Sequence, residues 1–262
     1  MKKEIVKPKK KLGQHFLIDK NIAKKITDLL YPKSENIIEL GPGTGVLTDF
    51  LIKKKINLKL VEIDNECVML LKKKYFNLKD QIINADFLKV NINNIFTNKI
   101  SLIGNFPYNI SSQILFKILE NKEDIIEIVG MFQKEVGERI IAKVNTKNYS
   151  RITILSNWKF NINKICEINP GSFFPKPKIK SMLLEFTPKT SYIKIKDPKN
   201  LEKLTKFFFS ERRKMVKKKF KKLFYDYKNF LKQIGINETC RPQNISIENY
   251  LLIVKELEKN SD

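Results

Sequence analysis

A glycine-rich turn at residues 41–45 follows directly after a short apolar run, and this feature most constrains the fold of the chain. The sequence there reads Glu39-Leu-Gly-Pro-Gly-Thr-Gly, and an amphipathic stretch begins near Val46. A tight turn between a strand and a helix needs residues without a Cβ atom where a ligand approaches the backbone. The segment therefore predicts a strand, a ligand-binding turn and a helix in succession.

Short apolar runs rich in Ile, Val and Leu recur along the first half of the chain. They cover residues 37–40, 58–63, 81–85, 101–104 and 127–132. Such runs are typical of buried parallel strands, and the segments between them carry apolar residues at helical spacing, as in 46–51 and 114–119. The alternation predicts an α/β fold with a Rossmann-like, doubly wound sheet that is mostly parallel.

The pattern changes after Asn161. Two candidate strands at 162–168 and 181–186 are joined by the proline-rich segment NPGSFFPKPKIK, which predicts an antiparallel hairpin at the edge of the sheet. From Leu201 onward apolar residues follow helical spacing alone, which predicts a small C-terminal helical domain. We therefore place a first domain at 1–190, including a basic N-terminal segment at 1–20, and a helical domain at 191–262.

Acidic residues close the second and third predicted strands. Glu62 can accept hydrogen bonds from ribose hydroxyls, and Asp86 can accept one from the amino group of an adenine. Each could instead be a turn former or helix cap, but together with Gly41 and Gly43 they place nucleoside-binding groups at successive strand ends. Neither a dinucleotide fingerprint nor a phosphate-binding loop is present, so we predict S-adenosylmethionine as the cofactor.

The tetrapeptide Asn105-Phe106-Pro107-Tyr108 follows the fourth predicted strand. Adenine N6 is a poor nucleophile, and acceptors on both of its hydrogens would favour a pyramidal nitrogen. The side-chain carbonyl of Asn105 and the backbone carbonyl of Phe106 can provide them, while Pro107 stiffens the turn and Tyr108 can stack on an extruded base. An isolated tetrapeptide of this kind is as readily a proline turn, so its position after this strand carries the prediction.

The basic composition favours a polyanionic partner. Lys and Arg number 51 against 28 Asp and Glu, a net charge of +23, part of which an AT-rich genome can explain. One basic cluster holds Lys2, Lys3, Lys7 and Lys9 to Lys11, and eight of the eleven residues at 212–222 are cationic. We predict that Arg212, Arg213, Lys218 and Lys222 contact RNA phosphates.

Other classes of protein are disfavoured. The three cysteines are widely separated and His15 is the single histidine, so we expect neither disulfides nor a metal site. No apolar run is long enough for a membrane span, and the N-terminus lacks the apolar region of a signal peptide. We expect a monomeric cytoplasmic protein with no membrane partner.

These motifs, together with LGQHFL at 12–17, MFQKEV at 131–136, FFPKPKIKS at 173–181 and ERRKM at 211–215, resemble the KsgA family of small-subunit ribosomal RNA adenine dimethyltransferases over nearly the whole chain. The family commonly has Asn where this chain has His15, and Leu or Ile where it has Phe106. An imidazole still forms hydrogen bonds and position 106 acts through its backbone, so we expect activity to survive.

The resemblance implies a specific site and substrate. It places His15 and Leu17 against the cofactor, completing the set Gly41, Gly43, Glu62, Asp86 and Asn105, and it places Phe173 beside the target base. Taken alone, His15 would be read as a polar loop residue and Phe173 as core. The implied reaction is dimethylation of two adjacent adenosines near the 3′ end of small-subunit ribosomal RNA during subunit biogenesis, with S-adenosylhomocysteine as product.

Other functions stay open at this point. A methyltransferase of large-subunit ribosomal RNA, of the macrolide-resistance type, would share the cofactor motifs. A ribosome-assembly factor or a transcription factor could use the same fold without catalysis, although the intact Asn105, Pro107 and Tyr108 favour an enzyme. A small-molecule methyltransferase would not need the basic run at 212–222.

Overall fold

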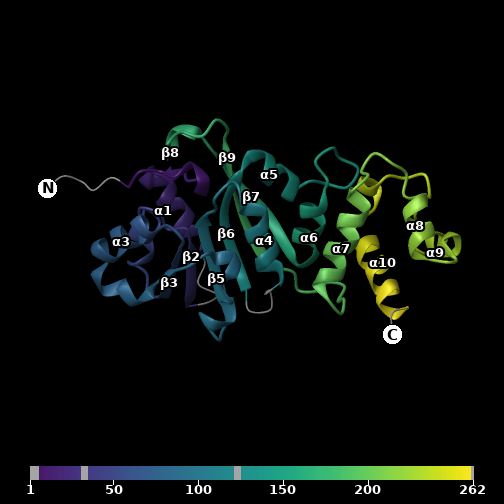
Figure 1. Ribbon diagram of the computed structural model, residues 1–262, viewed down its shortest axis with the longest axis horizontal. Helices are drawn as coiled ribbons and strands as arrows, with labels where there is room; N and C mark the ends of the chain where they lie inside the picture. The colour runs from purple at the N-terminus through teal and green to yellow at the C-terminus, as the bar shows by residue number, and fades with distance from the viewer. Residues whose placement is uncertain (1–5, 31–34, 121–124, 261–262) are drawn as a thin grey trace. The chain divides into compact units, whose positions relative to one another are not determined.

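The computed structural model describes residues 6–30, 35–120 and 125–260, which form two compact units (Figure 1). The first unit contains the described residues up to 137 together with 162–188, and the second contains 138–161 and the described residues from 189 onward. The chain thus leaves the first unit, returns to it, and leaves again near the boundary predicted at 190. Residues 138–161, which the sequence-based boundaries assigned to the first domain, join the second unit.

A seven-stranded sheet forms the centre of the first unit, and its strands follow the order β4-β3-β2-β5-β6-β9-β7. The strands are β2 (Asn36–Leu40), β3 (Asn57–Glu62), β4 (Ile82–Asn84), β5 (Ile100–Asn105), β6 (Ile125–Gln133), β7 (Phe160–Ile168) and β9 (Ser181–Pro188). β2 is parallel to both β3 and β5, so the order reverses between β2 and β5. This reversal confirms the predicted doubly wound sheet and creates a crevice at the carboxyl ends of these strands.

The far edge of the sheet is not parallel. β9 runs antiparallel to β6, with Gln133 opposite Ser181, and β7 lies beyond β9 at the edge. This arrangement confirms the predicted edge strands. A second, two-stranded antiparallel sheet joins β1 (Phe16–Leu17) to β8 (Phe173–Phe174), and the sequence did not predict it. It ties the N-terminal segment to the proline-rich segment between β7 and β9.

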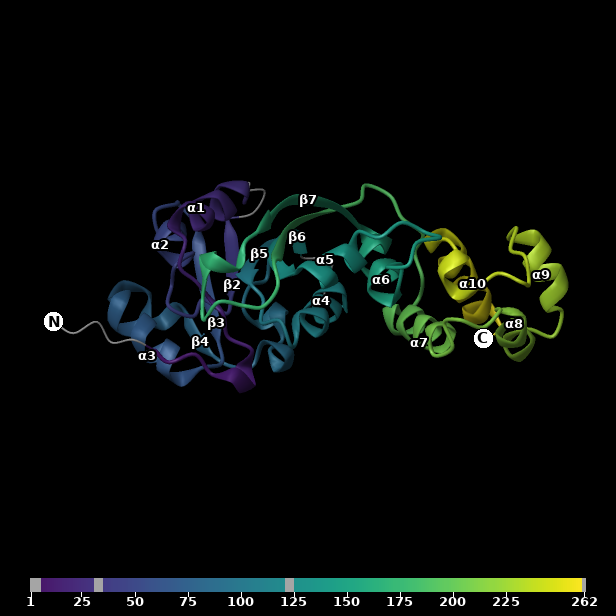
Figure 2. The same cartoon turned by 90° about the horizontal axis from the view of Figure 1, so that it is seen from above.

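Helices cover both sides of the sheet, and α1 and α4 lie on opposite sides of it in Figure 2. The helices of this region are α1 (Lys20–Leu29), α2 (Thr48–Leu51), α3 (Asn65–Lys74), α4 (Ser111–Glu120) and α5 (Lys134–Ile140). Helix α1 begins after Asp19, whose side chain accepts hydrogen bonds from two backbone N–H groups, and it buries Ala23 and Ile26 completely. None of the helices in the described part of the chain has the length and apolar character needed to cross a membrane.

The second unit is helical, as the sequence predicted from residue 201 onward. Its helices are α6 (Arg151–Lys159), α7 (Pro198–Phe209), α8 (Lys217–Leu223), α9 (Tyr227–Gln233) and α10 (Ile247–Lys259). Phe208 lies at its centre, edge-to-face with Phe220 at 5.3 Å and with Tyr250 at 5.6 Å between ring centroids. The Tyr250 hydroxyl donates to the carbonyl of Pro242, so the buried ring leaves its polar atom satisfied.

Candidate functional site

A cleft that is partly open to solvent lies where β2, β3 and β5 end. Its walls come from the N-terminal segment, the glycine-rich turn, the end of β3 and the tetrapeptide after β5. The lining residues that the sequence predicted as functional are His15, Gly41, Gly43, Glu62, Asn105, Phe106, Pro107 and Tyr108. Segments far apart in the sequence therefore meet at the edge of the sheet where a doubly wound fold binds its ligands.

Glu62 is held rigidly at the end of β3. It is 5% exposed, and its two carboxylate oxygens accept from the backbone N–H groups of Gly43 at 3.0 Å and Asp64 at 2.9 Å. Burial raises the pKa of Glu62, and the two backbone donors oppose that rise. Each carboxylate oxygen keeps a further acceptor site, so Glu62 can still accept from ligand hydroxyls.

The glycine-rich turn leaves room that a side chain would fill. At Gly43 φ is +56°, and a Cβ atom would stand 2.8 Å from Cδ1 of Phe16. At Gly41 φ is +64°, and a Cβ atom would stand 4.0 Å from both the Asn105 carbonyl oxygen and Pro107 Cδ. Bare backbone at Gly41 thus extends the cleft toward the tetrapeptide, as close approach of a ligand requires.

Asn105 has an unsatisfied acceptor. Its Nδ2 donates to the backbone carbonyl of His15 at 2.7 Å, whereas its Oδ1 is buried and has no hydrogen-bond partner. A buried oxygen without a partner is costly in a folded protein and marks a position that a ligand donor can satisfy. The His15 carbonyl fixes which end of the amide is free, and the free end is the acceptor.

Phe106 acts as a buried support for the tetrapeptide. Its side chain is fully buried and meets Phe132 edge-to-face at 5.2 Å. Gly104 and Gly130, neighbours on β5 and β6, make space for the ring, because a Cβ atom at Gly130 would stand 2.5 Å from it. The backbone carbonyl of Pro107 accepts from Ile110 N–H at 3.1 Å, which supports the prediction that the second acceptor is the carbonyl of Phe106.

Tyr108 and His15 form a stacked pair at the cleft. Their ring centroids are 5.3 Å apart and the rings are inclined by 27°. The Tyr108 hydroxyl forms a short hydrogen bond with Ser181 on β9, and Nδ1 of His15 lies 2.6 Å from the carbonyl oxygen of Pro175. Burial raises the pKa of Tyr108, while the bond to Ser181 opposes that rise. Each ring is thus held in place by a residue from the segment 175–181.

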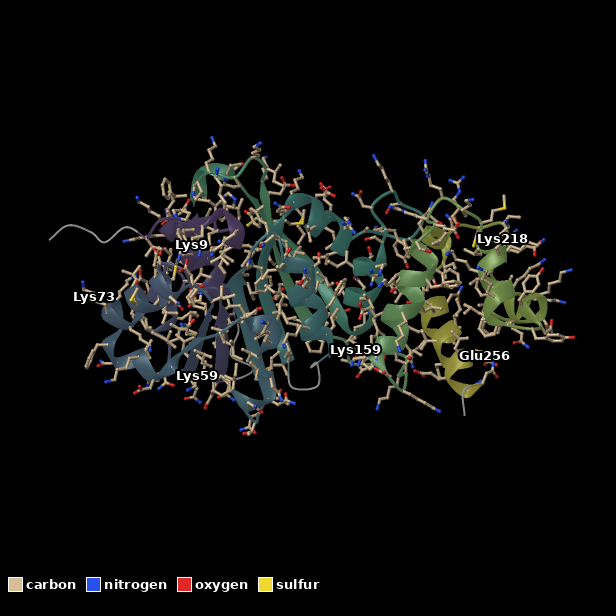
Figure 3. The ribbon with its side chains drawn as sticks, viewed as in Figure 1. Lys9, Lys59, Lys73, Lys159, Lys218 and Glu256 are labelled. Atoms are coloured by element: carbon tan, nitrogen blue, oxygen red, sulfur yellow. The ribbon has the colours of Figure 1, made fainter. Side chains whose placement is uncertain are left out.

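Sequence reasoning missed a network that fastens the N-terminal segment over the cleft. Asp64 accepts from Lys9 Nζ at 2.5 Å and from Gln14 Nε2 at 2.8 Å, and Gln14 Oε1 accepts from the backbone N–H of Lys9 at 2.7 Å (Lys9 is labelled in Figure 3). Burial alone would raise the pKa of Asp64, but the hydrogen bonds from Lys9 and Gln14 bring it below its ordinary value. The one sign of this network in the sequence is Asp64, an acidic residue just after the second predicted strand, whose side chain also caps α3 by accepting from Glu66 N–H.

The remaining cofactor and base-binding predictions lie outside the cleft lining. Leu17 is 4% exposed and lies beside the glycine-rich turn, in a small cavity next to the cleft. Asp86 accepts from Leu88 N–H at 2.9 Å, as the cap of a single helical turn after β4. Phe173 is 2% exposed and belongs to the same apolar core as Leu17.

The basic run of the second unit divides into surface and internal cations. Arg213, Lys218 and Lys222 are exposed, and Lys218 is labelled in Figure 3. Arg212 donates to the backbone carbonyl of Lys147, so it also holds the exposed loop at 143–148. Lys219 is 4% exposed and donates to the carbonyl of Phe207 at 2.6 Å, so it serves the core of the unit. Lys2 and Lys3 of the N-terminal basic cluster lie outside the described residues.

Glu39 is a buried acid near the end of β2, two residues before the glycine-rich turn. It is 1% exposed, its Oε2 accepts from Thr48 Oγ1 at 2.7 Å, and burial raises its pKa to about 8. Glu39 also lines the small cavity that Leu17 lines. Among the described residues, no three His, Cys, Asp or Glu side chains gather as they would to hold a metal ion.

The reversal of strand order between β2 and β5, the glycine turn at that point and the acid at the end of β3 define a Rossmann-like methyltransferase. Comparison with known proteins narrows the class further. The family model described as ribosomal RNA adenine dimethylase matches residues 5–259. The chain belongs to this family and is a methyltransferase.

Relatives and solved structures agree with this assignment. A protein named ribosomal RNA small subunit methyltransferase A from Pelagibacter ubique is 48% identical over 257 residues, which cover 97% of this chain and 98% of the relative. A protein of the same name from Flavobacterium johnsoniae is 42% identical over 257 residues, which cover 97% of both chains. A dimethyladenosine transferase from Plasmodium falciparum has a TM-score of 0.75 at 26% identity, covering 94% of this chain and 98% of that chain. The 23S rRNA methyltransferase ErmE, at 21% identity and a TM-score of 0.69 over 93% and 99% of the two chains, shares the fold.

Proposed function

We propose that the chain transfers methyl groups from S-adenosylmethionine to N6 of adenosines in small-subunit ribosomal RNA. The observation that carries this proposal is Oδ1 of Asn105, a buried acceptor without a partner on a residue that lines the cleft. The names of the two bacterial relatives support the small subunit as the source of the RNA. Dimethylation of two adjacent adenosines near the 3′ end is the specific form of this proposal.

The cleft suits the proposed cofactor. Gly41 leaves its backbone open toward Asn105 and Pro107, and Glu62 keeps acceptor sites for ribose hydroxyls. In this proposal His15, Gly41, Gly43, Glu62 and Asn105 hold S-adenosylmethionine. Leu17 contacts the cofactor from the small cavity beside the glycine-rich turn, and Asp86 accepts from the adenine amino group at the neighbouring strand end. The bound cofactor supplies an electrophilic methyl group on a sulfonium sulfur, and it needs no metal.

The tetrapeptide then prepares the adenine nitrogen. Asn105 Oδ1 and the Phe106 carbonyl accept the two N6 hydrogens, which turns the nitrogen lone pair out of the ring plane. Tyr108 stacks on the base, with its hydroxyl held by Ser181. An adenine reaches this position only when it is unpaired or flipped out of its stack. In this proposal Phe173 flanks the target base from the apolar core to which it belongs.

The proposed partner is ribosomal RNA within an assembling small subunit, bound by a monomer in the cytoplasm. The exposed Arg213, Lys218 and Lys222 supply phosphate contacts, and Arg212 reaches the same surface while it holds the loop at 143–148. We propose that the helical region at 191–262 adds RNA contacts to those made near the cleft, and that the region at 1–190 carries out methyl transfer. Residues 138–161 of that region belong to the helical unit.

The proposal is tested by incubating purified, unmethylated small and large subunits separately with the protein and cofactor labelled in its methyl group. We expect label in small-subunit RNA alone. Asn105→Ala should reduce the rate by about 10²- to 10³-fold, since it removes one acceptor aimed at the reacting nitrogen. Label confined to the large subunit would refute the choice of substrate, and an unchanged rate in Asn105→Ala would refute the role of Asn105.

A further inference from the structure

An exposed aromatic ring stands at the start of the loop between β8 and β9. Phe174 is 53% exposed, whereas its neighbour Phe173 is 2% exposed, because successive side chains of a strand point to opposite faces. An exposed phenylalanine is common on protein surfaces and by itself indicates nothing. Its position beside the cleft and the lysines that follow it in the loop indicate that this ring belongs to a binding surface.

Two contacts place Phe174 at the mouth of the cleft. It pairs with Phe16 across the small β1–β8 sheet, and Phe16 lines the cleft. The next residue, Pro175, accepts a hydrogen bond through its carbonyl from His15, whose ring stacks on Tyr108. In Figure 1, β8 and the loop after it lie beside the purple N-terminal segment. The exposed ring is therefore joined, through two residues, to the tyrosine proposed to hold the target base.

Cations alternate with prolines and an isoleucine in the same loop, at 176–180. Lys176, Lys178 and Lys180 are all exposed, and Lys180 lies 3.8 Å from Glu167. Within the described part of the chain, Lys176 and Lys178 form no ion pair with an acidic side chain. Pro175 and Pro177 restrict the backbone, so little conformational freedom is lost when the loop binds a partner.

We propose that Phe174 stacks on an unpaired nucleotide adjacent to the target adenine, and that Lys176 and Lys178 contact the flanking phosphates. The combination of an exposed ring with unpaired cations is the means by which proteins bind single-stranded nucleic acid. This subsite rests on the proposed function, because it takes the neighbour of the base that enters the cleft. It holds the strand beside the target base and so keeps the flipped adenine against Tyr108.

The test uses a short single-stranded RNA with one target adenine and 2-aminopurine beside it, whose fluorescence falls on stacking. Phe174→Ala should raise the dissociation constant by about 5- to 150-fold and abolish the fluorescence change. Phe174→Tyr should restore both. Ile179→Ala, which removes another exposed apolar side chain of the loop, should stay within about twofold of the parent. Lys176→Ala and Lys178→Ala should each lower the salt dependence of binding by about 0.7 in the log–log slope.

The outcomes separate this proposal from the proposed function. Unchanged affinity and fluorescence in Phe174→Ala would overturn the subsite while methylation by the parent leaves the function intact. Weaker binding of S-adenosylmethionine or a lower thermal midpoint in Phe174→Ala would also overturn it, because the ring would then be structural. Loss of methylation on whole subunits without any change on the short RNA would point to a protein neighbour and equally overturn it. If the parent quenches 2-aminopurine fluorescence and Phe174→Ala does not, but the parent fails to methylate N6, the subsite is supported and the proposed function is refuted.

Discussion

The stability of this protein should depend on pH through Glu39. The side chain is 1% exposed and its pKa is raised from 4.5 to about 8 by burial, with the charge of Glu62 adding to the rise. Between these two pH values the folded state holds a proton that the unfolded state has released. The contribution of Glu39 to stability is therefore fully present below pH 4.5 and is lost as pH rises through about 8.

The magnitude follows from the width of that interval. Each pH unit between 4.5 and about 8 changes the free energy of unfolding by up to roughly 1.4 kcal/mol, which accumulates to on the order of 5 kcal/mol. Glu39→Gln has nearly the same shape, keeps an oxygen that accepts from Thr48, and does not titrate. We expect the variant to match the parent at pH 5 and to be more stable by several kcal/mol at pH 9.

Urea unfolding followed by circular dichroism at pH 5, 6, 7, 8 and 9 measures this difference. Glu35→Gln, which removes an exposed carboxyl group from the residue just before β2, serves as the matched control and should follow the parent throughout. A difference between Glu39→Gln and the parent that stays constant with pH would refute the idea that the buried Glu39 is protonated in the folded state.

Three further substitutions test the cleft and the second unit. Gly43→Ala should weaken cofactor binding in calorimetry and lower the free energy of unfolding by about 1–3 kcal/mol, because its φ is +56° and its Cβ would stand 2.8 Å from Phe16; equal stability would contradict this. Gln14→Ala should speed amide exchange at residues 9–15, because it removes the hydrogen bond to Asp64 that holds this segment. It should lower kcat more than it raises KM for RNA, because the same segment carries the His15 carbonyl that orients Asn105. Amide exchange at parental rates would argue against the network through Asp64. Lys219→Ala should lower the free energy of unfolding in urea by about 1–3 kcal/mol, because it removes a buried hydrogen bond. Lys218→Ala should leave that free energy unchanged and reduce the salt dependence of RNA binding. The reverse pattern would refute the division into internal and surface cations.

Features set by local sequence were predicted correctly. The strands of the sheet follow from short apolar runs, and the reversal at β2 and β5 follows from the alternation of those runs with helical segments. The cleft was anticipated because the glycine-rich turn, Glu62 and Asn105 each stand at the end of a predicted strand, and parallel strands bring their ends to one edge.

Features set by distant contacts could not be predicted. The β1–β8 sheet joins Phe16 to Phe174 through strands of two residues, too short for any periodicity to be visible. The hydrogen bond between Gln14 and Asp64 joins residues 50 positions apart, and nothing in the local sequence of either residue identifies the other as its partner. The space for Phe106 depends on Gly104 and Gly130 becoming neighbours on β5 and β6, which only the register of these strands decides.

The most direct test of the central proposal is nucleoside analysis of small-subunit RNA after reaction with the parent and with Asn105→Ala. Mass spectrometry of the digested RNA should find N6,N6-dimethyladenosine with the parent and almost none with the variant. Because Asn105 also holds the cofactor in this proposal, both reactions are run at saturating S-adenosylmethionine, and the two proteins should bind the RNA with affinities that agree within a few-fold. Methylation at another atom, or equal dimethyladenosine from the two proteins, would contradict the role assigned to the unpaired oxygen of Asn105.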